Sequence, residues 1–273
     1  MTLRPLIVGL ALLVLAGCST IVPEPSDGPG RTIDNPHLIP DAVPRDVPKS
    51  RYGNPSSYEV FGQTYEVLDT AQGHRERGIA SWYGSKFHGR RTSSGEPYDM
   101  YGMTAAHKHL PIPVWVEVKR LDNDQRIVVK VNDRGPFADN RIIDLSYAAA
   151  AKLGMLGTGT APVEIRTLTP GEPASVQPVA AADPVSAPNT PQAAEATYWI
   201  QIAAFGEPNN AEQLRRNLES AALSTPVTIA QGDDGLHRVR LGPLTDVAAV
   251  DRATDELRRA NFAPGHVIIP TDP

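Results

Sequence analysis

Four segments between residues 78 and 144 are the most informative part of this chain. They read Gly78-Ile79-Ala80-Ser81-Trp82-Tyr83-Gly84, Gly95-Glu96-Pro97-Tyr98-Asp99-Met100, Thr104-Ala105-Ala106-His107 and Val131-Asn132-Asp133-Arg134-Gly135-Pro136-Phe137. Carboxylates, a histidine, an arginine and aromatic side chains gather on turns rich in Gly and Pro, between short apolar runs. Polar loops on a rigid scaffold are where binding and catalysis are usually placed, so this block is the candidate functional region.

The surrounding pattern predicts a small closed β-barrel. Residues 114–119 and 127–131 alternate apolar and polar side chains, and Asp122-Asn123-Asp124 between them is typical of a hairpin turn. Residues 79–82 and 163–168 are further strand candidates. A short alanine-rich helix is expected after Ser146, which would cap it, and Gly154 would end it. Many short strands with little helix favour a barrel over a layered fold.

This block closely resembles the catalytic domain of the rare lipoprotein A family, septal lytic transglycosylases that cleave peptidoglycan glycan strands. The resemblance covers residues 76–168, a third of the chain, and matches several separate motifs in order. It implies a double-psi β-barrel, which the spacing alone does not show. It also implies cleavage of the β-1,4 bond between N-acetylmuramic acid and N-acetylglucosamine, without a cofactor.

Such cleavage requires a group that protonates the leaving oxygen. A lytic transglycosylase uses the muramoyl 6-hydroxyl in place of water, so one carboxyl acting first as acid and then as base suffices. Asp133 is the first candidate, because it ends a strand whose apolar residues face away from it. Its ordinary interpretation is a turn residue paired with Arg134. Glu96, on a rigid loop, is the alternative acid, and composition alone makes a solvated loop carboxylate equally plausible.

The other candidate residues support the acid or line the groove. His107 is expected to orient a carboxylate or donate to a sugar oxygen, with Asp99 fixing its tautomer. His107 and His109 on one side of a strand also suggest a metal, but no thiolate or spaced ligand signature accompanies them, so no metal is predicted. Trp82, Tyr83 and Arg134 are expected to contact substrate, although Trp82 equally suits a core position.

Composition and the single cysteine restrict the class of protein. The 273 residues carry a formal charge of −5, which gives no indication of a nucleic-acid partner. An apolar run follows Arg4 and ends in Leu15-Ala16-Gly17-Cys18, so residues 1–17 are predicted to be a lipoprotein signal peptide and Cys18 the acylated residue. By resemblance to sorted bacterial lipoproteins, Ser19 after Cys18 predicts the periplasmic face of the outer membrane.

The rest of the chain divides into linkers and a second domain. Residues 18–50 are predicted to be a flexible tether, residues 51–75 a strap that packs on the barrel, and residues 169–196 a disordered Pro/Ala-rich linker. Residues 197–273 show the order βαββαβ, which predicts an α+β ferredoxin-like domain. The segments 198–206 and 237–244 resemble a sporulation-related (SPOR) repeat, which binds septal glycan strands stripped of stem peptides. Gln201, Arg238 and Trp199 are its expected glycan contacts.

Two alternatives remain open at this level. Barrels of this class include expansin-like proteins that bind and loosen polysaccharide without cutting it, and a lipoprotein that only links membrane to cell wall would show the same anchor and binding domain. Both a catalyst and a binder place carboxylates and aromatic rings in a groove.

Overall fold

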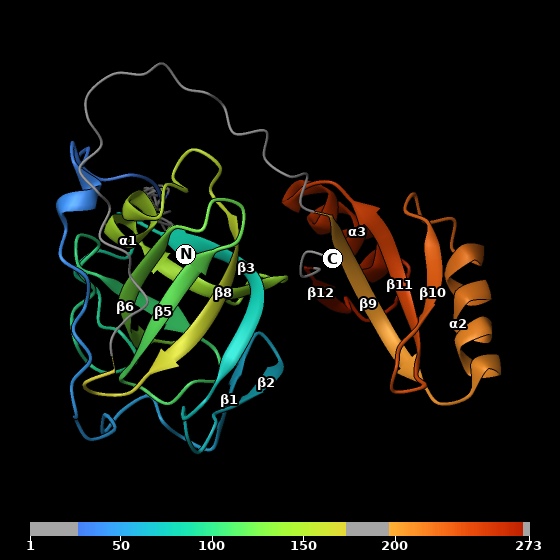
Figure 1. The fold of residues 1–273 in the computed structure, drawn as a ribbon, viewed down its shortest axis with the longest axis horizontal. Coiled ribbons are helices and arrows are strands. Elements are labelled where there is room, and N and C mark those ends of the chain that lie inside the picture. The colour runs from blue at the N-terminus through green and yellow to red at the C-terminus, as the bar shows by residue number, and fades with distance from the viewer. Residues whose placement is uncertain (1–26, 173–196, 270–273) are drawn as a thin grey trace, which may run out of the picture.

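The computed structural model describes residues 27–172 and 197–269, which form two domains (Figure 1). The predicted signal peptide, Cys18 and most of the Pro/Ala-rich linker lie outside the described residues.

The N-terminal domain is a closed barrel. Six strands close it in the order β3-β7-β4-β6-β5-β8. Neighbours β3 and β7 are parallel, as are β4 and β6, and the other pairs are antiparallel. The closed barrel expected from the sequence is therefore confirmed. Its elements are η1 (Pro36–Leu38), β1 (Ser57–Val60), β2 (Gln63–Glu66), β3 (Arg75–Tyr83), β4 (Thr104–His107), β5 (Val114–Arg120), β6 (Arg126–Asp133), β7 (Arg141–Ser146), α1 (Tyr147–Lys152) and β8 (Ala161–Leu168).

The barrel interior is filled by branched apolar side chains, including Val129 and Val131 of β6 and Ile143 and Leu145 of β7, all of which are buried. Strict alternation would place Asp133 on the same side of β6 as Val131. A β-bulge prevents this, because Ala105 of β4 pairs with Val131 whereas the next residue pairs with Asp133. The extra residue turns Asp133 to the outer face of the barrel wall, a use of bulges that is common beside active sites.

The helix after β7 begins and ends as its sequence predicts. The hydroxyl of Ser146 accepts a hydrogen bond from the amide of Ala149 at 3.1 Å, which caps α1. Gly154, just beyond the helix, has φ +69°, a conformation that glycine adopts without steric cost.

The N-terminal segment differs from the predicted free tether. From Asp27 onward it lies along the barrel: the Ala42 amide donates to the Val128 carbonyl at 3.0 Å, and the Lys152 ammonium donates to Asp41 at 2.8 Å. Its low apolar content suggested a free chain, but its polar groups find partners on the barrel. The strap of residues 51–75 also packs there, with the Tyr58 hydroxyl donating to the Lys108 carbonyl at 2.9 Å.

The C-terminal domain is a four-stranded antiparallel sheet in the order β10-β11-β9-β12, with both helices packed on one face. Buried Ile200, Val239 and Leu241 project from the sheet toward Leu218 of α2 and Leu257 of α3. The predicted βαββαβ order is confirmed. The elements are β9 (Tyr198–Phe205), α2 (Pro208–Ser220), β10 (Val227–Gln231), β11 (His237–Leu244), α3 (Val247–Arg259) and β12 (His266–Ile268).

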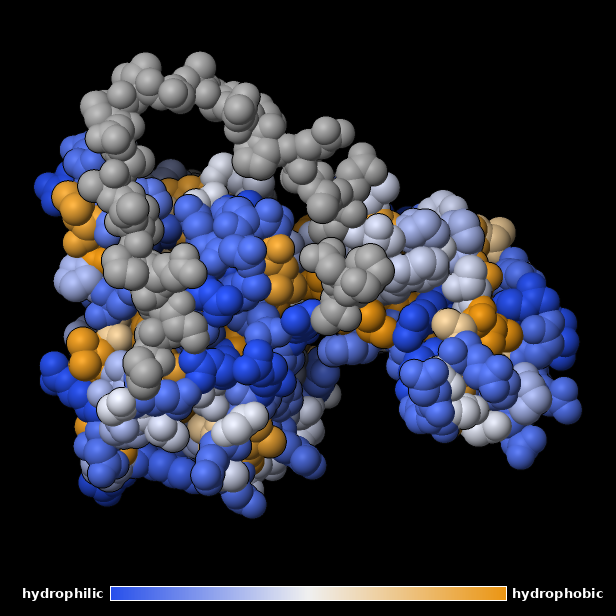
Figure 2. Space-filling view, in the orientation of Figure 1, coloured by the Kyte–Doolittle hydropathy of each residue, from blue (hydrophilic) through white to orange (hydrophobic). Residues whose placement is uncertain are grey.

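Figure 1 shows the two domains side by side, and hydrogen bonds join the start of β7 to α3. Arg141 donates to both carboxylate oxygens of Asp251, at 3.0 and 2.7 Å, and Asn140 donates to Thr254 at 2.8 Å. In the view of Figure 2 both domains present a mainly hydrophilic surface with small, separate hydrophobic areas. Among the residues described, no helix has the length and apolarity needed to cross a bilayer.

Candidate functional site

On the outer face of the barrel wall, Asp133 and Asp144 lie on the two strands that flank Ala106. Ala106 of β4 pairs with Asp133 on β6 and with Asp144 on β7. Asp144 in turn pairs with Ser81 on β3. Paired residues on neighbouring strands point to the same face of a sheet, so these side chains form one outward-facing row across four strands. We call Ser81, Asp144, Ala106 and Asp133 the carboxylate row.

Asp133 is held by one of its two oxygens. Its Oδ1 accepts hydrogen bonds from the amide and the hydroxyl of Ser93, at 2.8 and 2.7 Å, and from the Arg134 amide at 2.8 Å. Within the described residues nothing donates to its Oδ2. The carboxyl is therefore fixed in orientation with one oxygen available to a substrate, which suits the predicted catalytic role.

Glu96 contacts Asn132, the residue before Asp133, and is held as an anion. Lys130 Nζ lies 2.6 Å from one of its oxygens, and Asn132 Nδ2 donates to the other at 2.9 Å. Burial opposes the charged form, but the hydrogen bonds from Lys130 and Asn132 outweigh it and lower the pKa of Glu96. A carboxyl with a lowered pKa is a poor proton donor at neutral pH, so Glu96 is better suited to electrostatic support than to the acid role.

Arg134 is occupied by the main chain and not by the groove. Its guanidinium donates to the carbonyl oxygens of Gly53, His107 and Leu110, at 2.5 to 3.2 Å, and so joins the strap to the turn after β4. Arg134 was expected to contact substrate. The structure instead shows its hydrogen-bonding groups satisfied within the protein.

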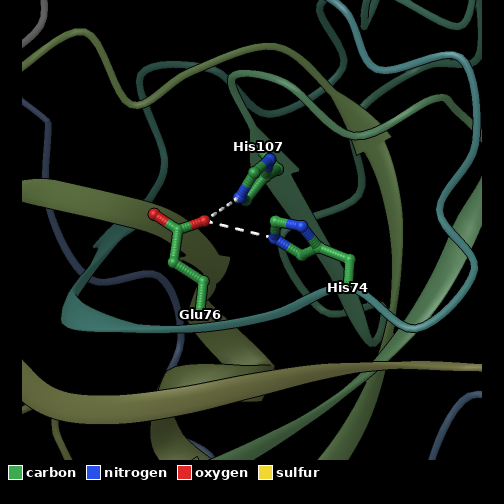
Figure 3. Close-up of side chains that lie close together, drawn as sticks. All are labelled: His74, Glu76 and His107. Atoms are coloured by element: carbon green, nitrogen blue, oxygen red, sulfur yellow. Dashed lines mark hydrogen bonds and ion pairs between the residues drawn. The ribbon is translucent and has the colours of Figure 1, made fainter. Parts of the chain in front are cut away.

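His107 is separated from the carboxylate row and from Asp99. It follows Ala106 on β4, so its ring points to the opposite side of the wall, where it is 1% exposed. Its Nε2 lies 3.3 Å from Glu76, which also contacts His74 Nε2 at 3.2 Å (Figure 3). Asp99 is 63% exposed and lies 3.8 Å from His88. The expected pairing of Asp99 with His107 is therefore wrong, and Glu76 takes that place.

The tautomer of His107 tests whether His74, Glu76 and His107 suit a metal ion. The ligand atoms of these three side chains lie within 4.8 Å of one another. However, His107 Nδ1 accepts hydrogen bonds from the amides of His109 and Leu110, both at 3.1 Å. The proton of the neutral ring then resides on Nε2 and is donated to Glu76. A metal ion at Nε2 would have to replace this proton and use the nitrogen lone pair. The three side chains therefore fit a structural hydrogen-bond network better than a metal centre.

The two predicted aromatic contacts differ in placement. The Tyr83 ring stacks on Tyr98 with centroids 4.1 Å apart and is 7% exposed, and its hydroxyl is buried without a hydrogen-bond partner in the described part of the chain. Trp82 is partly buried and packs against Tyr147, with centroids 5.7 Å apart. Tyr83 therefore borders the carboxylate row, whereas Trp82 contributes mainly to packing.

Asp144 and Ser81 are the members of the row that sequence reasoning did not select. The Ser81 hydroxyl donates to Asp144 Oδ1 at 2.6 Å. Burial raises the pKa of Asp144 from 3.8 to about 6, against the opposing effects of Ser81 and Arg141. The available signal was a lone carboxylate inside the apolar run Ile142-Ile143-Asp144-Leu145.

In the C-terminal domain, the sheet face opposite the helices carries the predicted glycan contacts. Gln201 pairs with Arg240, whose Nε donates to Gln201 Oε1 at 3.4 Å. Arg238 lies at the end of the sheet and binds Asp234. Trp199 packs against Gly242, where any side chain would collide with its ring. Arg240, two residues after Arg238 on the same strand, is an additional polar residue of this face.

Two family models match the chain. A lytic transglycolase model matches residues 75–165, and a SPOR domain model matches residues 194–269. These matches confirm the double-psi barrel and the SPOR domain expected from the sequence motifs. A crystal structure of the RlpA SPOR domain from Pseudomonas aeruginosa is 35% identical, covers 27% of this chain and 99% of that one, and superposes with a TM-score of 0.24.

Curated relatives match nearly the whole chain. The endolytic peptidoglycan transglycosylase RlpA of Pseudomonas aeruginosa strain UCBPP-PA14 is 37% identical over 96% of this chain and 95% of its own length. The protein of the same name from Vibrio cholerae is 40% identical over 93% of this chain and 92% of its own length. Because identity of this level extends over both domains, the chain belongs to the RlpA family of endolytic peptidoglycan transglycosylases.

Proposed function

We propose that this protein is a lytic transglycosylase that cleaves the β-1,4 bond between N-acetylmuramic acid and N-acetylglucosamine and leaves 1,6-anhydro-N-acetylmuramic acid ends. The observation that carries the proposal is the geometry of Asp133, with one oxygen fixed by three donors and the other available on the outer wall. The family match of the barrel supports the same chemistry.

In this proposal Asp133 exchanges the proton and Glu96 provides electrostatic stabilisation. As positive charge develops at the anomeric carbon, the Asp133 oxygen exchanges a proton with the sugar, and the muramoyl 6-hydroxyl attacks that carbon in place of water. Glu96, ionised through Lys130 and Asn132, supplies negative charge beside the site. Neither role requires a cofactor.

The C-terminal domain is proposed to hold the substrate. Its polar sheet face, with Gln201 and Arg240 adjacent, suits the hydroxyl groups of a glycan strand, and strands without stem peptides leave that contact unobstructed. The signal motif supports acylation at Cys18 and attachment to the periplasmic face of the outer membrane. Binding to stripped strands would then enrich the protein at the division septum.

Mass spectrometry of the products tests the reaction. Purified protein incubated with stem-free glycan strands should release fragments ending in the 1,6-anhydro ring, and Asp133→Asn should lower the rate by about 10² or more. Asp124→Asn, in an exposed turn, is the matched control and should retain the rate. Products heavier by one water would indicate hydrolysis instead. Binding without any product would favour the expansin-like alternative.

A further inference from the structure

We propose that Asp144 is a second catalytic carboxyl of this site, which protonates the leaving sugar oxygen while Asp133 accepts the proton of the muramoyl 6-hydroxyl. The proposal rests on the transglycosylase function proposed above and refines it, because it replaces one carboxyl that serves as both acid and base with two carboxyls of separate roles.

The pairing of the strands places the two carboxyls on one face of the barrel wall. Asp133 and Asp144 flank Ala106 on the same face, two strands apart. With strands about 4.8 Å apart, their Cα atoms are roughly 10 Å apart. The methyl group of Ala106 lies between them and is buried in a cluster with Tyr83 and Tyr98. The 6-hydroxyl and the leaving oxygen lie on the same face of the muramoyl ring, so two carboxyls on one face of the wall suit a division of the two proton transfers.

The surroundings of Asp144 favour the protonated form more than those of Glu96 do. Burial and the negative charge of Asp27 disfavour its carboxylate, while the Ser81 hydroxyl and the positive charges of Arg141 and Lys108 favour it, and the net effect raises its pKa to about 6. An acid with a pKa near the working pH combines a useful protonated fraction with ready proton transfer. Glu96, by contrast, is paired with Lys130.

The environment of the Tyr83 hydroxyl is a second observation, independent of Asp144, that favours a binding site in this part of the barrel wall. It is buried and meets no described group at normal hydrogen-bond geometry, although the Thr104 hydroxyl interacts with it and lowers its pKa. Burial first, and then the neighbouring Tyr98, Asp133 and Asp144, raise its pKa well above the usual value, so it lies within electrostatic range of both carboxyls and stays protonated. Leaving a buried hydroxyl unpaired is costly, and native proteins tolerate this mostly where function requires it.

The proposed step balances without an outside reagent. The C1–O4 bond breaks and O4 takes the Asp144 proton, which produces the free 4-hydroxyl of N-acetylglucosamine. The C1–O6 bond forms and the 6-hydroxyl proton passes to Asp133. Both carboxyls return to their starting state by exchanging protons with solvent.

A substrate with an activated leaving group separates the two roles. Full-length protein is assayed on stem-free glycan strands and on a dinitrophenyl glycoside of a short muramic-acid-terminated strand, whose leaving group needs no proton. Asp144→Asn should lose about 10²-fold or more on natural strands and remain within about tenfold of wild type on the dinitrophenyl substrate. Asp133→Asn should be impaired on both, and Asp124→Asn on neither.

The pH profile provides a second readout. Ser81→Ala removes a hydrogen bond that stabilises the Asp144 carboxylate, so the alkaline limb of kcat/KM should move to higher pH. Full activity of Asp144→Asn on natural strands, or equal losses on both substrates with the fold intact, would overturn the assignment. An unmoved alkaline limb in Ser81→Ala would also count against it. Failure of the wild type to form anhydro ends would instead overturn the proposed function itself.

Discussion

Replacing Asp144 with Asn should stabilise the protein above pH 6. Burial raises the pKa of Asp144 from 3.8 to about 6 in the folded state. A carboxyl that binds its proton more tightly when folded favours the native state fully below about pH 4, and this contribution is lost as the pH rises through 6. A difference of about two pKa units corresponds to about 3 kcal/mol of unfolding free energy, which is an upper value for a partly buried group.

The assay is thermal unfolding of wild type and Asp144→Asn at pH 4 and pH 8. Asn retains an oxygen that accepts the Ser81 hydrogen bond but carries no charge, so at pH 8 the variant should unfold several degrees higher. At pH 4, where the wild-type carboxyl is protonated, the two melting temperatures should nearly coincide. Asp124→Asn is the control of opposite sign, because the hydrogen bond from Lys119 lowers the pKa of Asp124, and its loss should destabilise slightly at pH 8.

The refuting result is a variant that is less stable than wild type at both pH values. That outcome would show that the Asp144 carboxylate is a structural anion and not a strained functional group. Gain of stability together with loss of turnover is the usual sign of a residue retained for activity.

Three further outcomes follow from the contacts of single side chains. Arg134→Ala should lower the unfolding free energy by about 3–5 kcal/mol, because buried carbonyl groups lose their donor, whereas exposed Arg90→Ala should change denaturant unfolding little. Glu76→Gln should destabilise by about 1–3 kcal/mol, and in NMR spectra the His107 Nε2 proton should lose its protection from solvent exchange. Replacing both Gln201 and Arg240 with Ala should weaken binding to stem-free strands, each lost hydrogen bond costing about 1 kcal/mol, while the melting temperature stays close to wild type; unchanged affinity in a pull-down would exclude this face.

The local pattern of the sequence was sufficient for most elements and not for their pairing. The alternation in Tyr198–Phe205 predicts β9, and Ser146 and Gly154 mark the ends of α1. These features depend on neighbours within a few residues. The parallel pairing of β4 with β6 depends on residues far apart in sequence, and so does the bulge that turns Asp133 outward. Only the family resemblance supplied the double-psi topology.

For the candidate site, too, the local sequence indicates individual residues but not the contacts that the fold creates between them. Asp133 and Glu96 were selected because polar residues on tight turns are visible in the sequence. The pairing of His107 with Asp99 is wrong because the carboxylate beside the ring is Glu76, which a distant part of the chain brings there and which no local pattern indicates. Arg134 was interpreted as a substrate contact because a sequence shows a charge but not the carbonyl groups that surround it.

The first described residue of the N-terminal segment, Asp27, contacts the edge of the site. The Asp27 carboxylate accepts hydrogen bonds from the amides of Gly84 and Lys86, each at 3.1 Å, directly after Tyr83. From that position its negative charge contributes to the raised pKa of Asp144. The N-terminal segment therefore acts on Asp144 through the charge of Asp27, which helps to keep that carboxyl protonated.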